Sequence, residues 1–272
     1  MGALAYPPVD GRPYRVTLGL RTLDLSEWLD IDEHFDTEMA RKNELLTDQH
    51  QQVVATLPIG DEAAAEGLQL ITAHLVQRFP DHGSVPDRTV HPIDAAGRLV
   101  QEDLCVMQRI DGEWRLVAAS VCFPSRWDLQ LKIGRSLHQI HAPVPDYDKI
   151  ADPTAGFFDR LTESRPMWRL NWSLLDDAEL FQQGRGGIAK PEVPVAGYTL
   201  RVERQTLRRL PVSGAVLFTI RTYRSTLGEL AIEKPEFLAD LAATLATVSS
   251  QTQDYKGWTE PMPRILAWLH AR

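Results

Sequence analysis

Cysteine is scarce in this 272-residue chain, which contains only Cys105 and Cys122. Two thiols cannot supply the four ligands that an iron–sulfur cluster usually takes. Asp111-Gly112 is a typical two-residue hairpin turn, and the pairing that it sets places Cys105 opposite Ala118. The two thiols are then roughly 13 Å apart along the strands, which is too far for a disulfide. We expect two free buried thiols, as in a reducing cytoplasm.

Positive charge is also in short supply, because 29 basic residues face 37 acidic ones and the net charge is −8. Broad nucleic-acid binding needs a basic surface, and an anionic membrane attracts one. No apolar run reaches the ~20 residues that span a bilayer. The first residues contain no basic segment followed by an apolar block, so they do not resemble a signal peptide. We expect a cytoplasmic protein without a nucleic-acid or membrane partner.

Motifs for nucleotide binding and for serine hydrolysis are missing as well. The chain has neither a Walker A loop nor a G-x-G-x-x-G sequence after a strand, and it has no G-x-S-x-G elbow. Any redox chemistry performed here must therefore take its electrons from another polypeptide.

What the chain does contain is a block of strands between two groups of helices. Asp61 opens a helix in which Leu68, Ile71 and Leu75 recur at helical spacing. A second helix begins near Pro235, a residue suited to a first helical turn. This order predicts an α+β fold with an antiparallel sheet, flanking helices and an N-terminal helical extension. We expect one domain, residues 1–272, made of a helical part (1–97), a sheet with helical insertions (98–225) and C-terminal helices (226–272).

Two late strands, residues 198–209 and 215–223, carry polar side chains on alternating positions. Arg201, Glu203 and Gln205 share one face of the first, whereas Arg204 lies on the other. Such a face is usually exposed to water. If the sheet instead closes over a cofactor, the face becomes the polar wall of a pocket. A carboxylate there can accept a hydrogen bond from an amine or guide protons to dioxygen, and an arginine favours its ionised form.

Two histidines, His138 and His141, lie three residues apart just before a proline-rich segment. The plain interpretation is a pair of hydrogen-bonded or surface histidines. Zinc would need further ligands, and the spacing does not match H-E-x-x-H. A haem needs only one protein ligand, most often histidine. His141 is the preferred ligand because the Ala-Pro-Val-Pro sequence that follows it fixes the backbone.

Basic and aromatic residues near these histidines suit the other parts of a haem. Arginine and lysine can neutralise its propionates, and tryptophan can cover its ring. For each residue taken alone, a solvated arginine or a tryptophan packed in the core is the favoured interpretation. The candidate cofactor-binding residues are His141, Arg126, Lys132, Trp127 and Arg204, with His141 as metal ligand, and the candidate catalytic residues are Glu203, Arg221 and Tyr223.

Six ordered blocks between about residues 14 and 256 resemble the haem-dependent oxidative N-demethylase family. The blocks are VQEDLCVM, VCFPSRW, LKIGRSLHQIHAPVP, WRLNWSL, LRVERQTLRRLP and LFTIRTY. The resemblance implies a PAS-like domain with haem b and the oxidation of a secondary methylamine, such as dimethylamine, by O2 with release of formaldehyde. It implies a separate flavin and iron–sulfur reductase. It also implies that His141 is the proximal ligand and that Glu203 and Arg221 are distal polar groups.

Two other functions fit the same residues. A PAS-type gas or redox sensor would bind haem without turnover, since a fold alone does not determine function. We see no output domain and no long heptad helix that would transmit a signal. The third interpretation is a haem-free protein whose pocket binds another apolar ligand.

Overall fold

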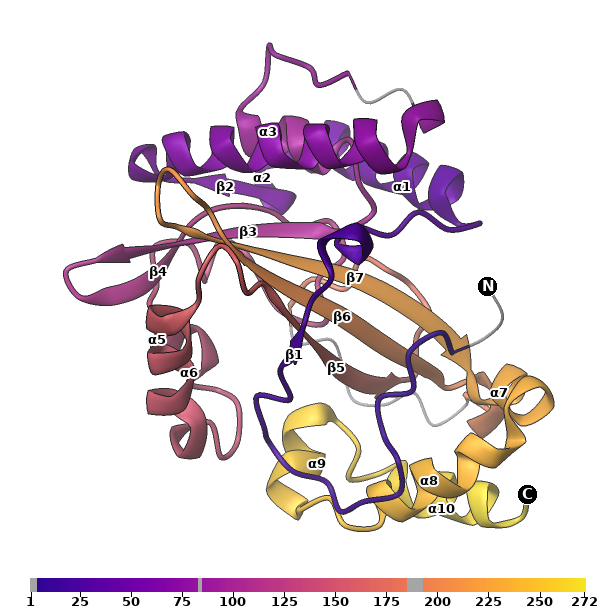
Figure 1. Ribbon diagram of the computed structural model, residues 1–272. Coiled ribbons are helices and arrows are strands. Elements are labelled where there is room, and N and C mark those ends of the chain that lie inside the picture. Colours follow the sequence, from indigo (N-terminus) through magenta and orange to yellow (C-terminus); the bar gives the residue numbers. More distant parts are fainter. Residues whose placement is uncertain (1–3, 83–84, 185–192) are drawn as a thin grey trace.

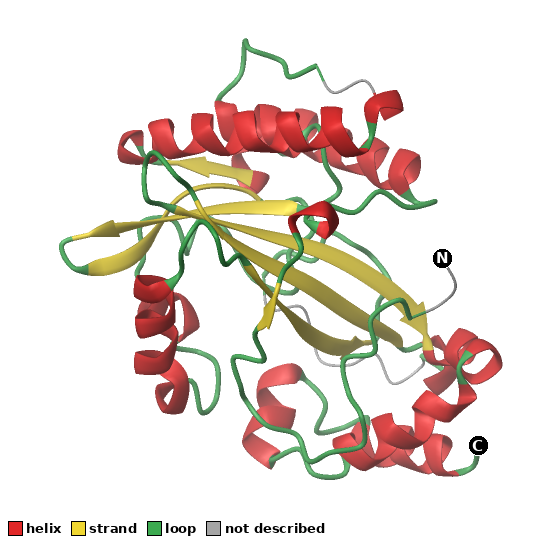
Figure 2. Ribbon diagram, viewed as in Figure 1, coloured by secondary structure: helices red, strands yellow, loops and turns green. Residues whose placement is uncertain are grey.

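The computed structural model describes residues 4–82, 85–184 and 193–272. Its centre is an antiparallel sheet in which seven strands are described, in the order β1-β5-β6-β7-β3-β4-β2. Helices flank this open sheet, so the α+β prediction is confirmed, and the arrangement is compatible with a PAS-like fold (Figure 2). The strands are β1 (Arg21–Thr22), β2 (Val54–Thr56), β3 (Asp103–Ile110), β4 (Glu113–Ser120), β5 (Met167–Leu175), β6 (Thr199–Arg209) and β7 (Val216–Thr226).

The helices form three groups around the sheet (Figure 1). The first group precedes β3 and consists of α1 (Phe35–Asp48), α2 (His50–Val53), α3 (Asp61–Arg78) and α4 (Pro92–Gly97). The second lies between β4 and β5 and consists of α5 (Leu137–His141) and α6 (Asp148–Arg160). The third follows β7 and consists of α7 (Leu227–Glu233), α8 (Pro235–Leu245), α9 (Ser250–Lys256) and α10 (Met262–His270). The helix starts expected at Asp61 and Pro235 are both observed.

Each face of the sheet packs against different helices. One face places Leu104 and Leu217 against α1, α3 and α4, and Leu200 and Val202 against α8 and α10. The opposite face packs against α5 and α6 through a smaller apolar cluster that includes Cys105. That cluster involves β3, β4, the start of β7, Met167 of β5 and Leu207 of β6, whereas the middle of the same face on β5 and β6 carries polar side chains. The polar part of this face is where the candidate site lies.

The β3–β4 hairpin follows the predicted register near its turn and departs from it further along. Ile110 pairs with Glu113, as the Asp111-Gly112 turn predicts. A β-bulge between Val106 and Met107 then shifts the pairing, so Cys105 lies opposite Ala119 and not Ala118. Both cysteines are free and buried, as expected. Burial raises the pKa of the Cys122 thiol to about 12, with a further increase from Asp103, so it stays protonated at neutral pH.

The N-terminal segment contributes more than helices to the fold. Within the part expected to be helical, residues 1–97, the short strands β1 and β2 join the two edges of the sheet. Ahead of β1, the chain crosses to the C-terminal helices, where the Tyr14 amide donates to Thr247 Oγ1 at 2.9 Å and Thr244 Oγ1 donates to the Arg12 carbonyl at 3.0 Å. The described helices include none that is long and apolar enough to cross a membrane.

Candidate functional site

His141 is presented by a short helix that is held at its start. Ser136 and Gln139 form a capping box at the N-terminus of α5, and His141 is its last residue. His141 Nδ1 lies 2.8 Å from the Leu137 carbonyl oxygen. A carbonyl only accepts, so Nδ1 carries the proton and the Nε2 lone pair is left available. The ring stacks on Tyr147, with centroids 4.7 Å apart and an interplanar angle of 14°.

These contacts suit a metal-ligating imidazole. Burial lowers the pKa of His141, and the charges of Lys132 and Arg169 lower it further. The hydrogen bond to the Leu137 carbonyl raises this pKa but does not cancel the decrease. A neutral ring whose second nitrogen donates to a backbone carbonyl is the usual state of a metal-bound histidine. His138, in contrast, is exposed, and its ring lies 6.3 Å from that of Tyr147. The geometry favours His141 over His138 as a ligand.

Glu203 lies at the centre of the polar face formed by β5 and β6. It is 7% exposed and accepts hydrogen bonds from Asn171 Nδ2 and Gln205 Nε2, both at 3.0 Å. Arg201 Nε lies 3.7 Å from its other carboxylate oxygen. The β5–β6 register pairs Asn171 with Glu203 and Arg169 with Gln205, which places all these side chains on one face. The shared face predicted for Arg201, Glu203 and Gln205 therefore occurs.

Arg169 connects the polar face to the histidine. Burial lowers the pKa of Arg169, while the charge of Glu203 opposes this shift. The charge of Arg169 also contributes to the lowered pKa of His141. Arg169 lies between Met167 and Asn171 on this face of β5. Met167 packs against the same apolar cluster as Ile140 of α5, and Asn171 donates to Glu203. The fold brings the two main candidate residues to the same region.

A half-buried lysine from the C-terminal helices completes this region. Lys256 ends α9, and its ammonium donates to the Trp172 carbonyl at 2.9 Å and to Ser173 Oγ at 3.3 Å. It also lies over the rings of Trp258 and Trp172, at 5.0 and 5.9 Å from their centroids. Burial lowers the pKa of Lys256 to about 8, and the charge of Glu203 opposes the shift.

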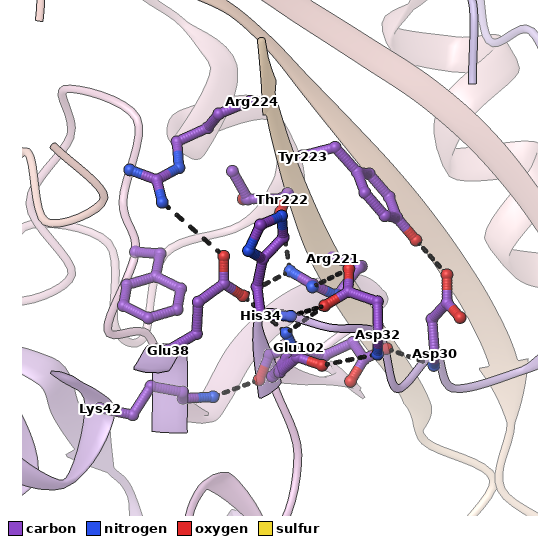
Figure 3. A network of polar contacts seen from close by, with 12 residues as sticks. Asp30, Asp32, His34, Glu38, Lys42, Glu102, Arg221, Thr222, Tyr223 and Arg224 are labelled. Carbon is purple, nitrogen blue, oxygen red and sulfur yellow. Dashed lines mark hydrogen bonds and ion pairs between the residues drawn. The ribbon is translucent and has the colours of Figure 1, made fainter. Parts of the chain in front are cut away.

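The fold separates three of the predicted site residues from His141 and Glu203. The β6–β7 register pairs Glu203 with Thr222, so the neighbouring residues Arg221 and Tyr223 belong to the opposite face. Figure 3 shows Arg221 and Tyr223 directed towards acidic side chains of the N-terminal segment. Arg221 contacts Asp32 at 2.7 Å and Glu38 at 2.8 Å, Tyr223 donates to Asp30, and Arg204 donates to the carbonyls of Glu27 and Trp28.

The remaining predicted cofactor-binding residues have partners within the protein. Arg126 pairs with Asp176 and donates to Gln182 Oε1 at 3.1 Å, so its charge is already matched. Lys132 donates to the Ile140 carbonyl and stays in electrostatic reach of His141. Trp127 is half-buried and packs against the apolar cluster below α5 and α6.

Three residues of this region were missed from the sequence: Arg169, Asn171 and Lys256. The first two had a signal, because Arg169, Asn171 and Ser173 alternate along β5 with Trp168, Leu170 and Trp172. Such a period of two places the polar side chains on one face. Lys256 had none, because only the tertiary fold brings the end of α9 to the edge of β5.

Fold and site together define an α+β protein in which a neutral histidine and a buried polar face lie between an antiparallel sheet and its flanking helices. The sequence matches the family described as haem-dependent oxidative N-demethylase, alpha subunit-like, over residues 19–89 and 83–266. The chain belongs to this family, as its sequence blocks predict.

The donor set fits the haem that the family description implies. Among the described residues, no group of three or more His, Cys, Asp or Glu side chains is placed to hold a bare metal ion. A single imidazole with a free Nε2 is instead sufficient for haem iron. The half-buried cations Arg169 and Lys256 lie at the same face of the sheet and suit the acidic groups of a haem.

Proposed function

We propose that this chain binds haem b through His141 and oxidatively demethylates a small secondary amine of the dimethylamine type. Two points support the proposal: membership of the family, and the packing of α5, which carries His141, against the face of the sheet that carries Arg169 and Glu203. The second observation carries it. A ligand histidine and a buried carboxylate within reach of one arginine provide both a cofactor ligand and a polar group for a substrate.

The chemistry of the reaction is divided between cofactor and protein. When bound, haem supplies the activation of O2 and the oxidation of the methyl group. Overall, the amine, O2, two electrons and two protons give a carbinolamine and water, and the carbinolamine then breaks down to formaldehyde and the shorter amine. The electrons come from a separate flavin and iron–sulfur reductase. We also propose that residues 1–272 form one PAS-like haem domain located in the cytoplasm.

The protein's share is positioning and charge. The Nδ1–Leu137 bond and the Tyr147 stack orient the His141 ring, so little freedom remains to be lost on ligation. Glu203 keeps a carboxylate in a site from which most water is excluded, stabilised by two amide donors and Arg201. In this proposal it accepts a hydrogen bond from the amine N–H and orients the methyl group. Arg204, Arg221 and Tyr223 hold the N-terminal segment instead of contacting the substrate.

An absorption spectrum and a formaldehyde assay test this function. The purified protein, supplied with hemin, should show a Soret band that is lost in His141→Ala and kept in the matched variant His138→Ala. With dimethylamine, a surrogate reductant and air, it should release formaldehyde. Glu203→Gln should keep the haem and lose about 10²-fold or more in turnover, whereas the exposed control Glu236→Gln should not change it. A protein that stays colourless with hemin contradicts the proposal.

A further inference from the structure

Two half-buried cations, Arg169 on β5 and Lys256 at the end of α9, lie at the polar face. Among the described residues, no carboxylate oxygen lies within 4.0 Å of the Arg169 guanidinium or the Lys256 ammonium. The hydrogen bond that Arg169 makes, to the Thr17 carbonyl, is long at 3.4 Å, and its Nε is buried without an acceptor. Lys256 donates only to neutral oxygens. The protein therefore stabilises the positive charges of Arg169 and Lys256 through hydrogen bonds to neutral oxygens and not through close ion pairs.

Glu203 does not balance these two charges. It is the carboxylate in electrostatic reach of both Arg169 and Lys256, and it also faces Arg201 at 3.7 Å. Arg201 is also in reach of Asp103 and Glu38, whereas Glu203 is the one described carboxylate that acts on both Arg169 and Lys256. Partly burying a charge without a close partner is unfavourable, and burial lowers the pKa of both Arg169 and Lys256. Among the described residues neither cation has a carboxylate of its own, so the negative groups of a bound ligand would stabilise both.

We infer that Arg169 and Lys256 bind the two propionate carboxylates of haem. This inference rests on the proposed haem-binding function and assigns the anchoring of the cofactor to residues on β5 and α9. Both cations lie at the sheet face that carries Glu203, because the β5–β6 register places Arg169 there and Lys256 donates to Ser173 on the same face. Arg126 is not available for this role because Asp176 already pairs with it.

The same charges imply an order of binding. A secondary amine is a cation at neutral pH, and an apo site whose two cations lack close carboxylates repels it. Haem brings two carboxylates that neutralise these cations and remove the repulsion. Haem therefore binds first, and the apoprotein has little affinity for the amine.

A comparison of haem with its dimethyl ester tests the inference, because the ester keeps the iron and ring but lacks both charges. Titrations followed at the Soret band should show that the wild-type protein binds haem at least about tenfold more tightly than the ester. Arg169→Gln and Lys256→Gln should each weaken haem binding about tenfold and leave ester binding unchanged. The exposed residues give matched controls, Arg165→Gln and Lys234→Gln, which should bind both ligands like the wild type.

The apoproteins supply a second measurement that does not depend on activity. Since Lys256 has no carboxylate partner in the apoprotein, Lys256→Met should unfold in urea at the same concentration as the wild type or a higher one. A purely structural lysine would give a lower midpoint. Equal binding of haem and ester by the wild type would refute the inference and leave the haem function standing. No binding of either compound would refute the proposed function itself.

Discussion

At the scale of single residues, buried polar groups in this protein differ in whether the chain itself supplies their partners. Lys42 is fully buried and donates to the carbonyls of Val100, at 2.8 Å, and Glu102. Asp103 accepts from the amides of Cys122 and Phe123. Arg169 lacks comparable partners. Buried polar groups with partners inside the protein stabilise the fold. A group without such partners either binds a ligand or lowers the free energy of unfolding.

His74 on α3 is a buried histidine whose protonation should limit stability in acid. It is 8% exposed, its Nε2 has no partner, and burial, with the charges of Arg208 and Arg78, lowers its pKa to about 4. In the unfolded chain the pKa is about 6.5. The stabilisation is therefore complete above pH 6.5 and is lost as the pH falls towards 4.

We expect protonation of His74 to lower the free energy of unfolding by about 1–2 kcal/mol between pH 6.5 and 4. The effect is not larger because His74 lines a surface pocket of about 240 Å³, where solvent partly screens its charge. Urea unfolding of His74→Gln at pH 8, 6.5, 5 and 4 should show a smaller decrease. The exposed control His270→Gln should follow the wild type. Identical pH profiles for His74→Gln and wild type would contradict this account.

At the scale of elements, close contacts between helices and strands decide which glycines can be replaced. Gly97 ends α4, and a Cβ built there lies 2.2 Å from Ser120 Oγ and 3.0 Å from Ser120 Cβ on β4. Gly67, inside α3, would place its Cβ 3.5 Å from the nearest Leu217 atom, which is an ordinary contact. The two helical glycines therefore allow a matched comparison.

Gly97→Ala should lower the free energy of unfolding by about 2–3 kcal/mol, because the added methyl group forces α4 away from β4. Gly67→Ala should be neutral or stabilise by up to about 1 kcal/mol, since alanine restricts the unfolded chain and suits a helix. The check is urea unfolding of both variants and of Gly97→Ala combined with Ser120→Gly. If removing the Ser120 side chain does not recover part of the loss, the close contact is not its cause.

Elements also show how far the sequence determines the fold and the site. Alternation along β6 predicted the shared face of Arg201, Glu203 and Gln205, and the Asp111-Gly112 turn predicted the hairpin register at its closed end. The bulge after Val106 was not predictable, because the residues around it form an even apolar run. The short edge strands β1 and β2 have too few residues to show a period.

The same limit applies to the candidate site. Local pattern was sufficient to propose His141 and Glu203 as candidates, and their roles remain predictions. It could not tell that Arg221 and Tyr223 face the N-terminal segment, because Asp30 and Asp32 are nearly 200 residues away in sequence. Lys256 was missed for the same reason. Contacts between distant segments depend on packing, which a single sequence does not display.

At the scale of the whole molecule, one buried arginine joins the beginning of the chain to its last strand. Arg221 on β7 binds Asp32 at 2.7 Å and Glu38 at 2.8 Å, and all three side chains are nearly inaccessible (Figure 3). Although burial opposes ionisation, the Arg221 guanidinium lowers the pKa of Asp32. Glu38 receives a further hydrogen bond from Gln101 at 2.8 Å. The helical N-terminal part is thus fixed to the sheet by charge as well as by apolar packing.

Removing this arginine should have a larger effect than removing a neighbouring hydrogen bond. Arg221→Met leaves the carboxylates of Asp32 and Glu38 buried without their cation, and we expect a loss of about 3–5 kcal/mol in the free energy of unfolding. Tyr223→Phe, which loses only the bond to Asp30, should lose about 1–2 kcal/mol. Urea unfolding measures both values, and amide hydrogen exchange should rise first in α1.

Because the loss comes from unpaired charge, removing the two carboxylate charges as well should restore much of the stability. The triple variant Arg221→Met, Asp32→Asn, Glu38→Gln tests this. A triple variant that is no more stable than Arg221→Met would rule out this explanation.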